Sequence, residues 1–258
     1  MARKKLKWSD MRPSEKRDHV IYLIGQILKW LFVGSMCIFT LYPVVYTLLG
    51  SFKTNAELTL GGNFLPENWQ FNNYVYAFQK LDFGKYFLNS VVLALLTVVF
   101  TLITSSMAAY VISRRDFVGK KLISTAYLLS MFISVGSVAL YPLYTLMSRL
   151  GLTKNMVGLA LMLTGGQAAN IFMISGFING VPKDLDEAAT IDGAGPFRIF
   201  WQIIVPAIKP ILGVIALFAF RQAWNEFVTA QVFTMANPGL KTLSVAVANL
   251  RYSANAAA

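Results

Sequence analysis

The residues best suited to bind a polar solute lie together inside an apolar stretch, Ile211–Met235. They are Arg221, Trp224, Asn225 and Glu226. Arg221 and Asn225 are four positions apart, so they would share one face of a helix, and Trp224 adds a flat apolar plate beside them. Proteins commonly hold sugar rings between such a plate and a few amides or charges. The structural alternative is a polar clamp between helices, or an ion pair in which Glu226 neutralises Arg221.

Two amides, Gln167 and Asn170, interrupt a second apolar stretch, Asn155–Pro182, and present the same choice. Polar groups inside a membrane span are costly and are usually functional, which favours contact with a solute. Single amides also often do no more than bond a neighbouring helix. We therefore predict a solute path that includes these two amides and the four residues named above, with helix–helix bonding as the alternative.

Arg221 supports a hypothesis about the charge of that solute. It lies twelve residues after Lys209, which is about 18 Å along a helix and near the middle of a bilayer of roughly 30 Å. Arginine stays charged even in apolar surroundings, and its planar fork matches a carboxylate with two hydrogen bonds. A permanent cation at this depth favours an acidic saccharide over a neutral one.

The sequence offers little for catalysis or metal binding. It has one cysteine, Cys37, inside an apolar run and one histidine, His19, in a basic stretch, so neither a disulfide framework nor a His/Cys metal site can be built. No loop pairs two carboxylates or sets a nucleophile beside a base. We predict no catalytic residue, no metal site and no cofactor bound by this chain, so a membrane-bound enzyme has little support.

Composition places the candidate residues in a membrane. Hydrophobic residues make up 56% of the 258 residues and charged residues only 14%, with a mean hydropathy of +0.55. Each helical crossing needs about 20 apolar residues. Uncharged stretches of that length are Trp30–Gly50, Tyr86–Ser113, Leu122–Ser148 and Asn155–Pro182, and Ile211–Met235 is equally apolar apart from its polar centre. We predict an all-α membrane bundle with spans at about 30–50, 86–112, 122–147, 156–180 and 208–235, preceded by a basic arm and an interfacial helix over 1–29.

The distribution of basic residues indicates the orientation. The formal net charge is +11, and the cations gather in residues 1–19, 113–121 and 181–209, as the positive-inside rule requires of cytoplasmic segments. The charge therefore reports orientation, and we predict no nucleic-acid partner. With the N-terminus in the cytoplasm, five spans would leave the C-terminus outside. We expect the natural protein to continue beyond Ala258 into a sixth helix.

The outer segment Ser51–Lys85 is long and rich in aromatic residues. Between Phe71 and Leu81 it favours a short amphipathic helix capped by Asn72 or Asn73. Such a segment could cover the bundle at the membrane interface, or it could form a docking surface for an external partner.

The segment Val181–Pro210 differs from the apolar stretches on both sides of it. Asp184 followed by Glu187 fits a capping box, which predicts a helix that starts at Leu185. Gly193 suits the left-handed residue that ends such a helix. The helix is therefore expected to be short and sharply terminated.

A second helix is predicted to follow at once, because in Gly195-Pro196 the proline loses no hydrogen bond at a first helical position. Its apolar residues Phe197, Phe200, Trp201 and Ile204 share one face. The two helices would form a rigid knob with small residues on one side and apolar residues on the other. Such a knob is suited to insertion into a groove of another protein.

The spacing of this segment resembles the EAA loop of ABC importer permeases. It runs Glu187-Ala188-Ala189, three residues, Gly193, nine residues, Ile203, one residue, then Val205-Pro206. The family has leucine where this chain has Val205. The run EAATIDGA is similar to the carbohydrate-uptake branch, the relatives of the maltose-transporter permeases. Further matches, within a resemblance that covers roughly residues 20–250, are Asn73-Tyr74, Asn89-Ser90 and Trp224-Asn225-Glu226-Phe227.

The resemblance implies a type I importer permease in the cell inner membrane. Such a permease pairs with a second permease, by family habit a paralogue, and with two cytosolic ATPase subunits that carry ATP and magnesium. An external solute-binding protein delivers the sugar. The EAA loop inserts into a groove of the ATPase, and the matching residues here are Glu187, Ala188, Ala189, Asp192, Gly193, Ala194 and Phe197. This sequence has no G-x-x-x-x-G-K-[ST] motif, so ATP hydrolysis belongs to the partner.

Two alternative functions would keep a similar topology. An ABC importer for another small polar solute would share the EAA loop, although the Trp224-Asn225 pair favours sugars. A secondary transporter would show inverted repeats, broken helix pairs or chains of intramembrane acids. Within the expected spans, Glu226 is the only acidic residue, and Gly165-Gly166 is the only sign of a broken helix, and a weak one. The sequence therefore gives a secondary transporter little support.

Overall fold

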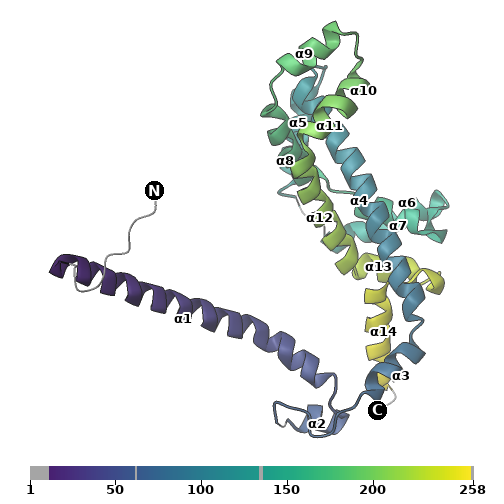
Figure 1. The fold of residues 1–258 in the computed structure, drawn as a ribbon. Helices are drawn as coiled ribbons and strands as arrows, with labels where there is room; N and C mark the ends of the chain where they lie inside the picture. The colour runs from purple at the N-terminus through teal and green to yellow at the C-terminus, as the bar shows by residue number, and fades with distance from the viewer. Residues whose placement is uncertain (1–11, 62, 134–135, 257–258) are drawn as a thin grey trace. The chain divides into compact units, whose positions relative to one another are not determined.

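The computed structural model describes residues 12–61, 63–133 and 136–256, and these residues form helices and their connections without a strand. The prediction of an all-α fold is confirmed for them. The chain divides into two compact units, residues 1–80 and residues 81–258, each with its own packing. Figure 1 labels the helices of both units.

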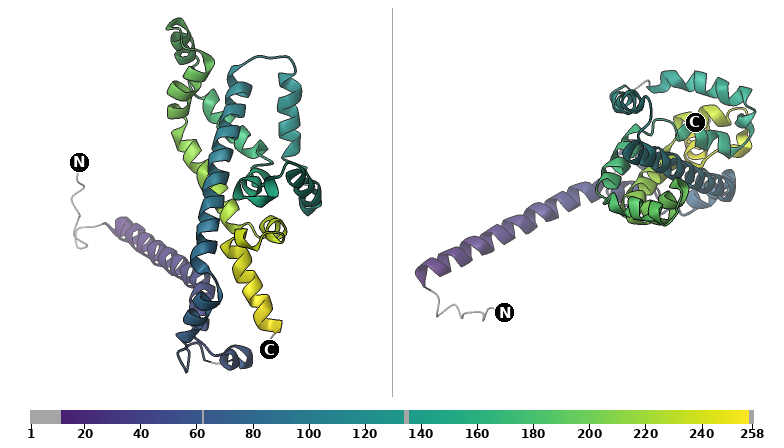
Figure 2. Two further views of the ribbon diagram at one scale, coloured as in Figure 1. Left: turned by 90° about the vertical axis from the view of Figure 1, so that its right-hand side faces the viewer. Right: turned by 90° about the horizontal axis from the view of Figure 1, so that it is seen from above.

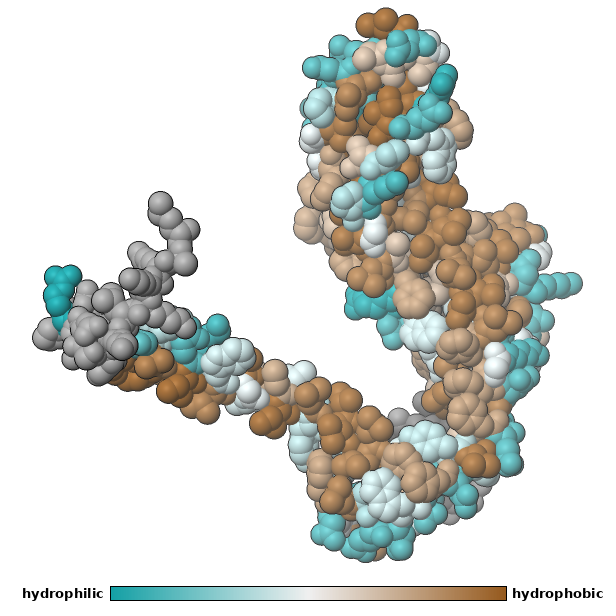
Figure 3. All heavy atoms as spheres, viewed as in Figure 1, coloured by the Kyte–Doolittle hydropathy of each residue, from teal (hydrophilic) through white to brown (hydrophobic). Residues whose placement is uncertain are grey.

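The first unit consists of one long helix and a folded segment after it. Its helices are α1 Pro13–Gly50, α2 Asn55–Leu60 and α3 Asn72–Lys80. α1 runs without interruption through the expected interfacial helix and the first expected span, and it includes Pro43. Hydrophobic side chains cover most of the length of α1 on the face seen in Figure 3. From His19 to Gly50 this helix is long and apolar enough to cross a membrane.

Local hydrogen bonds hold the segment that follows α1. Thr54 and Glu57 form a capping box at the start of α2, and the second carboxylate oxygen of Glu57 accepts the backbone N–H of Asn68 at 3.2 Å. The Lys53 side chain is buried, and its Nζ donates to the carbonyl of Asn63 at 2.6 Å. These bonds fold the loop into a compact structure.

The helix predicted in this segment is confirmed as α3, but its predicted caps are wrong. Asn72 is already the first helical residue. The Asn73 amide instead donates to the carbonyls of Ser51 and Lys53, at 3.0 and 3.1 Å. The reason is tertiary, because α3 folds back to the end of α1 and brings these carbonyls within reach of the amide.

The second unit packs around α4 Phe83–Arg114, which runs through most of the unit in Figure 1 and Figure 2, with α9 and α10 extending beyond its end. The other α-helices are α5 Lys120–Ser130, α6 Leu140–Arg149, α7 Met156–Leu163, α8 Ala168–Asn179, α9 Asp184–Ile191, α10 Pro196–Ile199, α11 Val205–Ala207, α12 Lys209–Asn225, α13 Val228–Thr234 and α14 Leu243–Ala256. Single turns of 3₁₀ helix lie at Gly136–Ala139, Leu152–Lys154 and Pro238–Leu240, and a π turn at Phe200–Ile204. Of these elements, α12, α8 and α7 pack most extensively on α4.

Two buried clusters line α4. Near its C-terminal end, Tyr110 packs with isoleucines of α8 and α12 and with Phe200. Nearer its N-terminus, Leu93 packs with α7 and with Phe233 of α13. Small hydroxyl residues on α4, such as Thr97, return their O–H to a carbonyl of the same helix, here that of Leu93 at 2.8 Å. A residue bonded in this way allows close helix packing and leaves no buried hydroxyl unpaired, whereas the buried hydroxyl of Ser113 has no hydrogen-bond partner among the described residues.

Only some of the expected spans are single helices. Among the described residues, two helices are long and apolar enough to cross a membrane, residues 19–50 and α4. The number rises to four if each of two bent pairs is counted as one span. α7 and α8 bend by 67°, and the stretch from α10 to α11 bends by 83° against α12.

Each of the stretches expected as spans over 122–147, 156–180 and 208–235 contains more than one helix. Gly136 (φ 54°) and Gly166 (φ 71°) take left-handed conformations that are open to glycine. Glu226 is extended, with ψ 121°, between α12 and α13. Apolar composition indicates which segments lie in the bilayer, but it does not show where the helices within them are interrupted.

Candidate functional site

The EAA segment, residues 181–210, forms a helix–turn–helix at one end of the second unit (Figure 1). Its first helix, α9, ends as predicted at a left-handed Gly193, with φ 80°. The N–H of Gly193 donates to the carbonyl of Thr190 at 3.0 Å, and the N–H of Ala194 to that of Ala189 at 2.9 Å. These two bonds make a Schellman motif, which satisfies the last carbonyls of α9 and fixes the direction of the turn.

The predicted start of α9 is wrong by one residue, and the predicted capping box does not form. α9 begins at Asp184 itself, and no side chain caps it. The preceding Lys183 has a helical backbone (φ −68°, ψ −24°) instead of the extended conformation usual for a capping residue. Asp184, Asp186 and Glu187 still lie in the first turn, where the helix dipole stabilises negative charge.

The second helix begins as predicted at Pro196, after an extended Gly195. The chain then widens into the π turn and bends into α12. Pro206 has no N–H to donate to the carbonyl four residues before it, which interrupts the regular helical ladder at this place. The 83° bend itself falls at Ile208, between α11 and α12. Pro210, the second residue of α12, has no N–H to donate to the carbonyl of Pro206, so the helical ladder is also interrupted across the bend.

The four apolar residues of the second helix differ in burial. Phe200 and Ile204 are 3% and 0% exposed, whereas Phe197 and Trp201 are 67% and 45% exposed. The ring of Phe200 lies 5.3 Å from that of Tyr110 on α4. Phe200 and Ile204 are therefore buried where this helix packs against α4, and Phe197 and Trp201 remain at the surface.

Most residues that match the EAA pattern are accessible to a partner. Glu187, Ala188, Asp192, Gly193 and Phe197 are exposed, and Ala189 and Ala194 are half-buried. Two further apolar side chains of α9, Leu185 and Ile191, are also exposed. The Glu187 carboxylate makes no hydrogen bond or ion pair with any residue that the structure describes. Exposed apolar side chains next to free carboxylates are suited to a groove on another protein.

In the predicted solute path, α12 carries Arg221 and Asn225 but ends before Glu226. The Asn225 amide donates to the carbonyl of Arg221 at 2.8 Å, and the Arg221 side chain is exposed. Glu226 Oε1 accepts the backbone N–H of Thr229 at 2.8 Å and thereby caps α13. Glu226 is thus engaged elsewhere, and no ion pair joins it to Arg221 in the structure, where both residues are described.

Trp224, the proposed apolar plate, is held by two other rings. It stacks on Phe220 with ring centroids 5.6 Å apart, and it meets the edge of Phe87 from α4 at 5.8 Å. Its carbonyl accepts a hydrogen bond from Ser244 of α14 at 3.1 Å. The ring is half-buried and therefore fixed in orientation.

Gln167 and Asn170 lie at the bend between α7 and α8 and bond to each other. The Asn170 amide donates to Gln167 Oε1 at 2.6 Å, and Gln167 Nε2 donates to the carbonyl of Thr164 at 2.7 Å. Gln167 Nε2 also lies 3.5 Å from the hydroxyl of Thr101 on α4. These contacts match the structural alternative for the two amides, which are half-buried.

The structure places the bend of α7–α8 near the end of α12. Gln222 of α12 donates to the carbonyl of Leu163, the last residue of α7, at 3.5 Å. Leu163 and Ala223 also pack in the same buried cluster. Non-helical backbone inside a membrane is tolerated where it is buried in protein or lines a cavity. The two breaks are therefore a suitable place for a polar path.

The sequence pattern did not reveal what Asn89-Ser90 does. The Asn89 amide donates to the carbonyls of Gly239 and Lys241, both at 2.9 Å. The Ser90 hydroxyl accepts the N–H of Leu243 at 2.8 Å. The pair ties the first turns of α4 to residues 239–243, just before and at the start of α14, about 150 residues away along the chain. Its match to the family pattern was the only signal available, because nothing local indicates so distant a contact.

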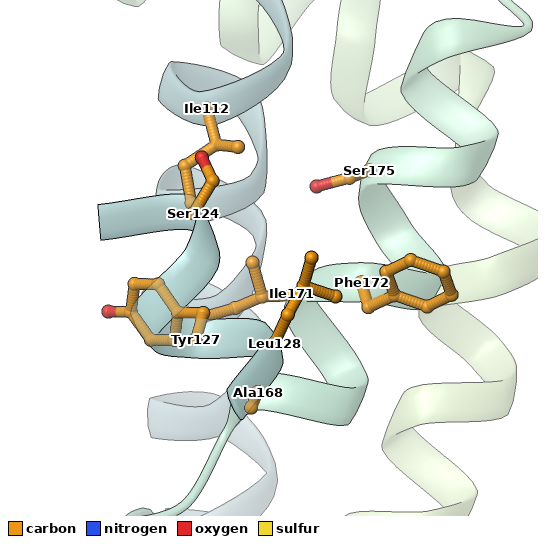
Figure 4. A pocket seen from close by; sticks show the side chains of 8 residues that line it. All are labelled: Ile112, Ser124, Tyr127, Leu128, Ala168, Ile171, Phe172 and Ser175. Atoms are coloured by element: carbon orange, nitrogen blue, oxygen red, sulfur yellow. The ribbon is translucent and has the colours of Figure 1, made fainter. Parts of the chain in front are cut away.

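A separate cavity lies between α5 and α8 (Figure 4). Its volume is about 160 Å³, and it is lined by Ile112, Ser124, Tyr127, Leu128, Ala168, Ile171, Phe172 and Ser175. The lining is mostly apolar, and the volume is below the roughly 300–1,000 Å³ typical of ligand pockets. None of the predicted path residues lines it. We assign this cavity no role in solute binding.

The described residues provide no metal site, since no three His, Cys, Asp or Glu side chains among them are grouped so as to hold an ion. The cysteine at position 37 is exposed on α1.

Comparison with known proteins gives one family. Residues 101–257 match the family described as binding-protein-dependent transport system inner membrane component. The chain is 33% identical over 191 residues to the diacetylchitobiose uptake system permease protein NgcG of Streptomyces coelicolor, an alignment that covers 74% of this chain and 63% of that protein. It is 32% identical over 231 residues to the galactooligosaccharides transport system permease protein GanQ of Bacillus subtilis, covering 88% of this chain and 81% of GanQ.

A solved structure is similar over most of the chain. It is described as the crystal structure of a bacterial ABC transporter involved in the import of the acidic polysaccharide alginate. The match has a TM-score of 0.72 and 26% sequence identity, and it covers 86% of this chain and 78% of the other. The chain thus spans slightly less than two thirds of the length of NgcG and larger shares of the other two proteins.

Proposed function

Because the chain belongs to the family of binding-protein-dependent transport system inner membrane components, we propose that it is the permease subunit of an ATP-driven importer of a sugar or oligosaccharide. The observation that carries this proposal is the EAA segment, an exposed helix–turn–helix whose turn is fixed by the Schellman motif at Gly193. The chain itself performs no catalysis and binds no cofactor in this proposal. ATP and magnesium are bound by a separate ATPase.

The proposed complex has two permeases, two cytosolic ATPases and an external solute-binding protein. The second permease is a paralogue of this chain. This chain crosses the inner membrane several times with its N-terminus in the cytoplasm, and the EAA segment lies on the cytoplasmic side. The basic residues of 1–19, 113–121 and 181–209 support that orientation.

In the proposed mechanism, closure of the ATPases around ATP moves their grooves, and the seated EAA segment moves with them. The spans then rock between inward-open and outward-open states, as in other rigid-body transitions. Glu187 provides a charge for the groove, and the small Ala188 and Ala189 allow α9 to approach its walls closely. Asp192, Ala194 and Phe197 complete the surface that enters the groove.

The substrate class is inferred from the relatives and from Trp224. NgcG and GanQ are permeases of sugar systems by their names, and a fixed indole next to the Asn225 amide suits a sugar ring. The similar alginate importer handles an acidic polysaccharide, and the exposed Arg221 gives this chain a cation that would suit an acidic sugar. The proposed path consists of Arg221, Trp224, Asn225, Glu226, Gln167 and Asn170.

We expect an ATPase subunit to co-purify with the detergent-solubilised chain, and its ATP hydrolysis to rise when a sugar and the binding protein are added. The probes are diacetylchitobiose, a galacto-oligosaccharide and an alginate oligomer, and the control omits the binding protein. A complex without an ATPase would contradict the importer assignment. If only an amino acid or phosphate stimulated hydrolysis, the chain would still be an importer permease, but its proposed substrate class, sugars, would be wrong.

Gly193→Val should uncouple ATP hydrolysis from uptake without unfolding the spans. Gly193 has φ 80°, and a Cβ there would meet no atom within 4 Å, so the cost is conformational, about 1 kcal/mol or more. The strain would turn the second helix away from α9. The matched control is Gly195→Val, because Gly195 also has open space but an extended backbone (φ −73°, ψ 165°) that valine adopts readily. If Gly193→Val transported as much per ATP as Gly195→Val and the wild type, the left-handed turn would not be needed for coupling.

A further inference from the structure

The last residue of α4, Arg114, contacts three other parts of the chain with one guanidinium group. Its side chain is 4% exposed. One terminal nitrogen, Nη2, donates to the carbonyl of Ile178 at 3.0 Å and to that of Val181 at 2.6 Å. Ile178 belongs to the last turn of α8, whose carbonyls have no partners within the helix and where the helix dipole favours a cation. Arg114 thus connects the end of α4 to the end of α8.

The same guanidinium reaches the EAA segment. Arg114 Nε lies 3.1 Å from Asp186 Oδ2 in the first turn of α9, and the Asp186 side chain is 18% exposed. The contact is ionic and not a directed hydrogen bond, since Arg114 Nε and Asp186 Oδ1 both lack a hydrogen-bond partner among the described residues. An attraction of this kind tolerates small rotations of α9, but separating the charges would leave a buried cation without its partner, which is costly.

α9 has few other attachments to the second unit. None of its residues is buried, and only the half-buried Ala189 packs against the nearby hydrophobic cluster. The charge pair between Arg114 and Asp186 is therefore the main polar connection between α9 and the long helix α4. Near its other end, α4 is bonded through Asn89 and Ser90 to residues 239–243 at the start of α14. Asn89 lies about 38 Å from Arg114 along α4, at 1.5 Å per residue.

We propose that Arg114 is a positioning residue that transmits movement of the EAA segment to α4. The proposal rests on the proposed function, because it requires an ATPase that moves α9. A displacement of α9 acts on Asp186, then on Arg114 and the end of α8, and α4 carries it to the segment before α14. Arg114 itself contacts neither the ATPase nor the solute in this scheme.

The test compares Arg114→Gln with Arg115→Gln in the complete complex reconstituted in liposomes. Arg115 is the adjacent residue and is exposed, so both variants remove one charge at the same end of α4. The probe is the saccharide that most stimulates the wild-type complex among the three named above. The measurements are the amount of bound ATPase, stimulated ATP hydrolysis and saccharide molecules transported per ATP.

We expect Arg114→Gln to assemble with the ATPase but to transport at least about tenfold fewer molecules per ATP, within the range of coupling between sites. Arg115→Gln should keep the wild-type ratio. Arg114→Lys, which retains the charge, should recover part of the loss. A wild-type ratio in Arg114→Gln would overturn the proposal.

Two further measurements cover the other outcomes. If Arg114→Gln fails to fold, the proposal is tested with Asp186→Asn, because asparagine has the shape of aspartate but cannot form the ionic contact with Arg114. It should lower the ratio as well, and a normal ratio would contradict the proposal. If no ATPase binds the wild-type complex, the proposed function fails first, and the role of Arg114 fails with it.

A measurement without solute covers the case in which no saccharide stimulates hydrolysis. Spin labels at Asp184→Cys on α9 and Val99→Cys on α4, in a chain with Cys37→Ser, report the distance between the two helices with and without ATP. In the chain that keeps Arg114, the distance should be the same with and without ATP, because α4 moves together with α9. In Arg114→Gln, the addition of ATP should shift or broaden the distance distribution. The same distribution in both would overturn the proposal.

Discussion

Replacing Glu187 with lysine should lower both uptake and ligand-stimulated ATP hydrolysis by about tenfold or more, as is common when a charge at an interface is lost. The side chain is exposed and has no partner among the described residues of this chain. The substitution therefore breaks no contact within the permease, and the helices should stay folded. The loss would arise at the proposed groove of the ATPase, where a cation would replace a carboxylate.

The matched control for this prediction is Asp184→Lys. Asp184 lies in the same first turn of α9, is also exposed, and undergoes the same change of charge. Uptake into liposomes and ATP hydrolysis are measured for both variants, together with the amount of ATPase that co-purifies. A loss confined to Glu187→Lys supports a specific contact. Equal losses in both variants would show that the net charge of α9 matters and not a specific contact of Glu187. Full activity of Glu187→Lys would show that Glu187 has no role in coupling.

Arg221→Gln should abolish a preference for acidic saccharides. The Arg221 side chain is exposed, and Glu226, the nearest carboxylate in the sequence, is used to cap α13. The helix also ends between the two residues, so Glu226 does not follow Arg221 along α12. The cation is therefore free to meet a carboxylate of the solute.

The expected size of this effect follows from the geometry of arginine. A carboxylate held by hydrogen bonds to a charged group is favoured by about 1.5–3 kcal/mol, which corresponds to roughly tenfold to a hundredfold discrimination. Uptake of a uronate oligomer is compared with uptake of its neutral, carboxyl-reduced analogue. We expect the wild type to prefer the uronate and Arg221→Gln to take up both equally.

The control for the loss of charge is Arg149→Gln, at the exposed end of α6 and outside the proposed path. It should keep the wild-type preference. If the wild type transports both oligomers equally, or if Arg221→Gln leaves the preference unchanged, Arg221 has a structural role and the solute is not selected by its charge.

Several features of this protein could be predicted from the sequence because they depend on residues close together in the chain. The all-α membrane class follows from apolar runs of helical length. The turn of the EAA segment follows from Gly193, since a left-handed conformation next to the end of a helix strongly favours glycine. The start of the second helix at Pro196 follows from the missing N–H of proline. The resemblance to the EAA loop rests on the same local spacing.

Other features were decided only by the tertiary structure. Asp184 and Glu187 have the spacing of a capping box, yet the backbone at Lys183 is helical and the box does not form. Phe197 and Phe200 are equally apolar, and only packing against Tyr110 of α4 determines which of the two is buried. The cost of exposing an apolar ring depends on its neighbours, which the local pattern does not contain.

Contacts between distant segments were also beyond the reach of the sequence pattern. Arg114 is one of four cations in a basic loop by sequence, and the structure makes it the link between α4, α8 and α9 through carbonyls 64 and 67 residues away. Asn89 likewise bonds carbonyls 150 and 152 residues away. Backbone carbonyls are present at every residue, so composition and spacing cannot show which of them a distant side chain will reach. Only the folding of the chain brings the two together.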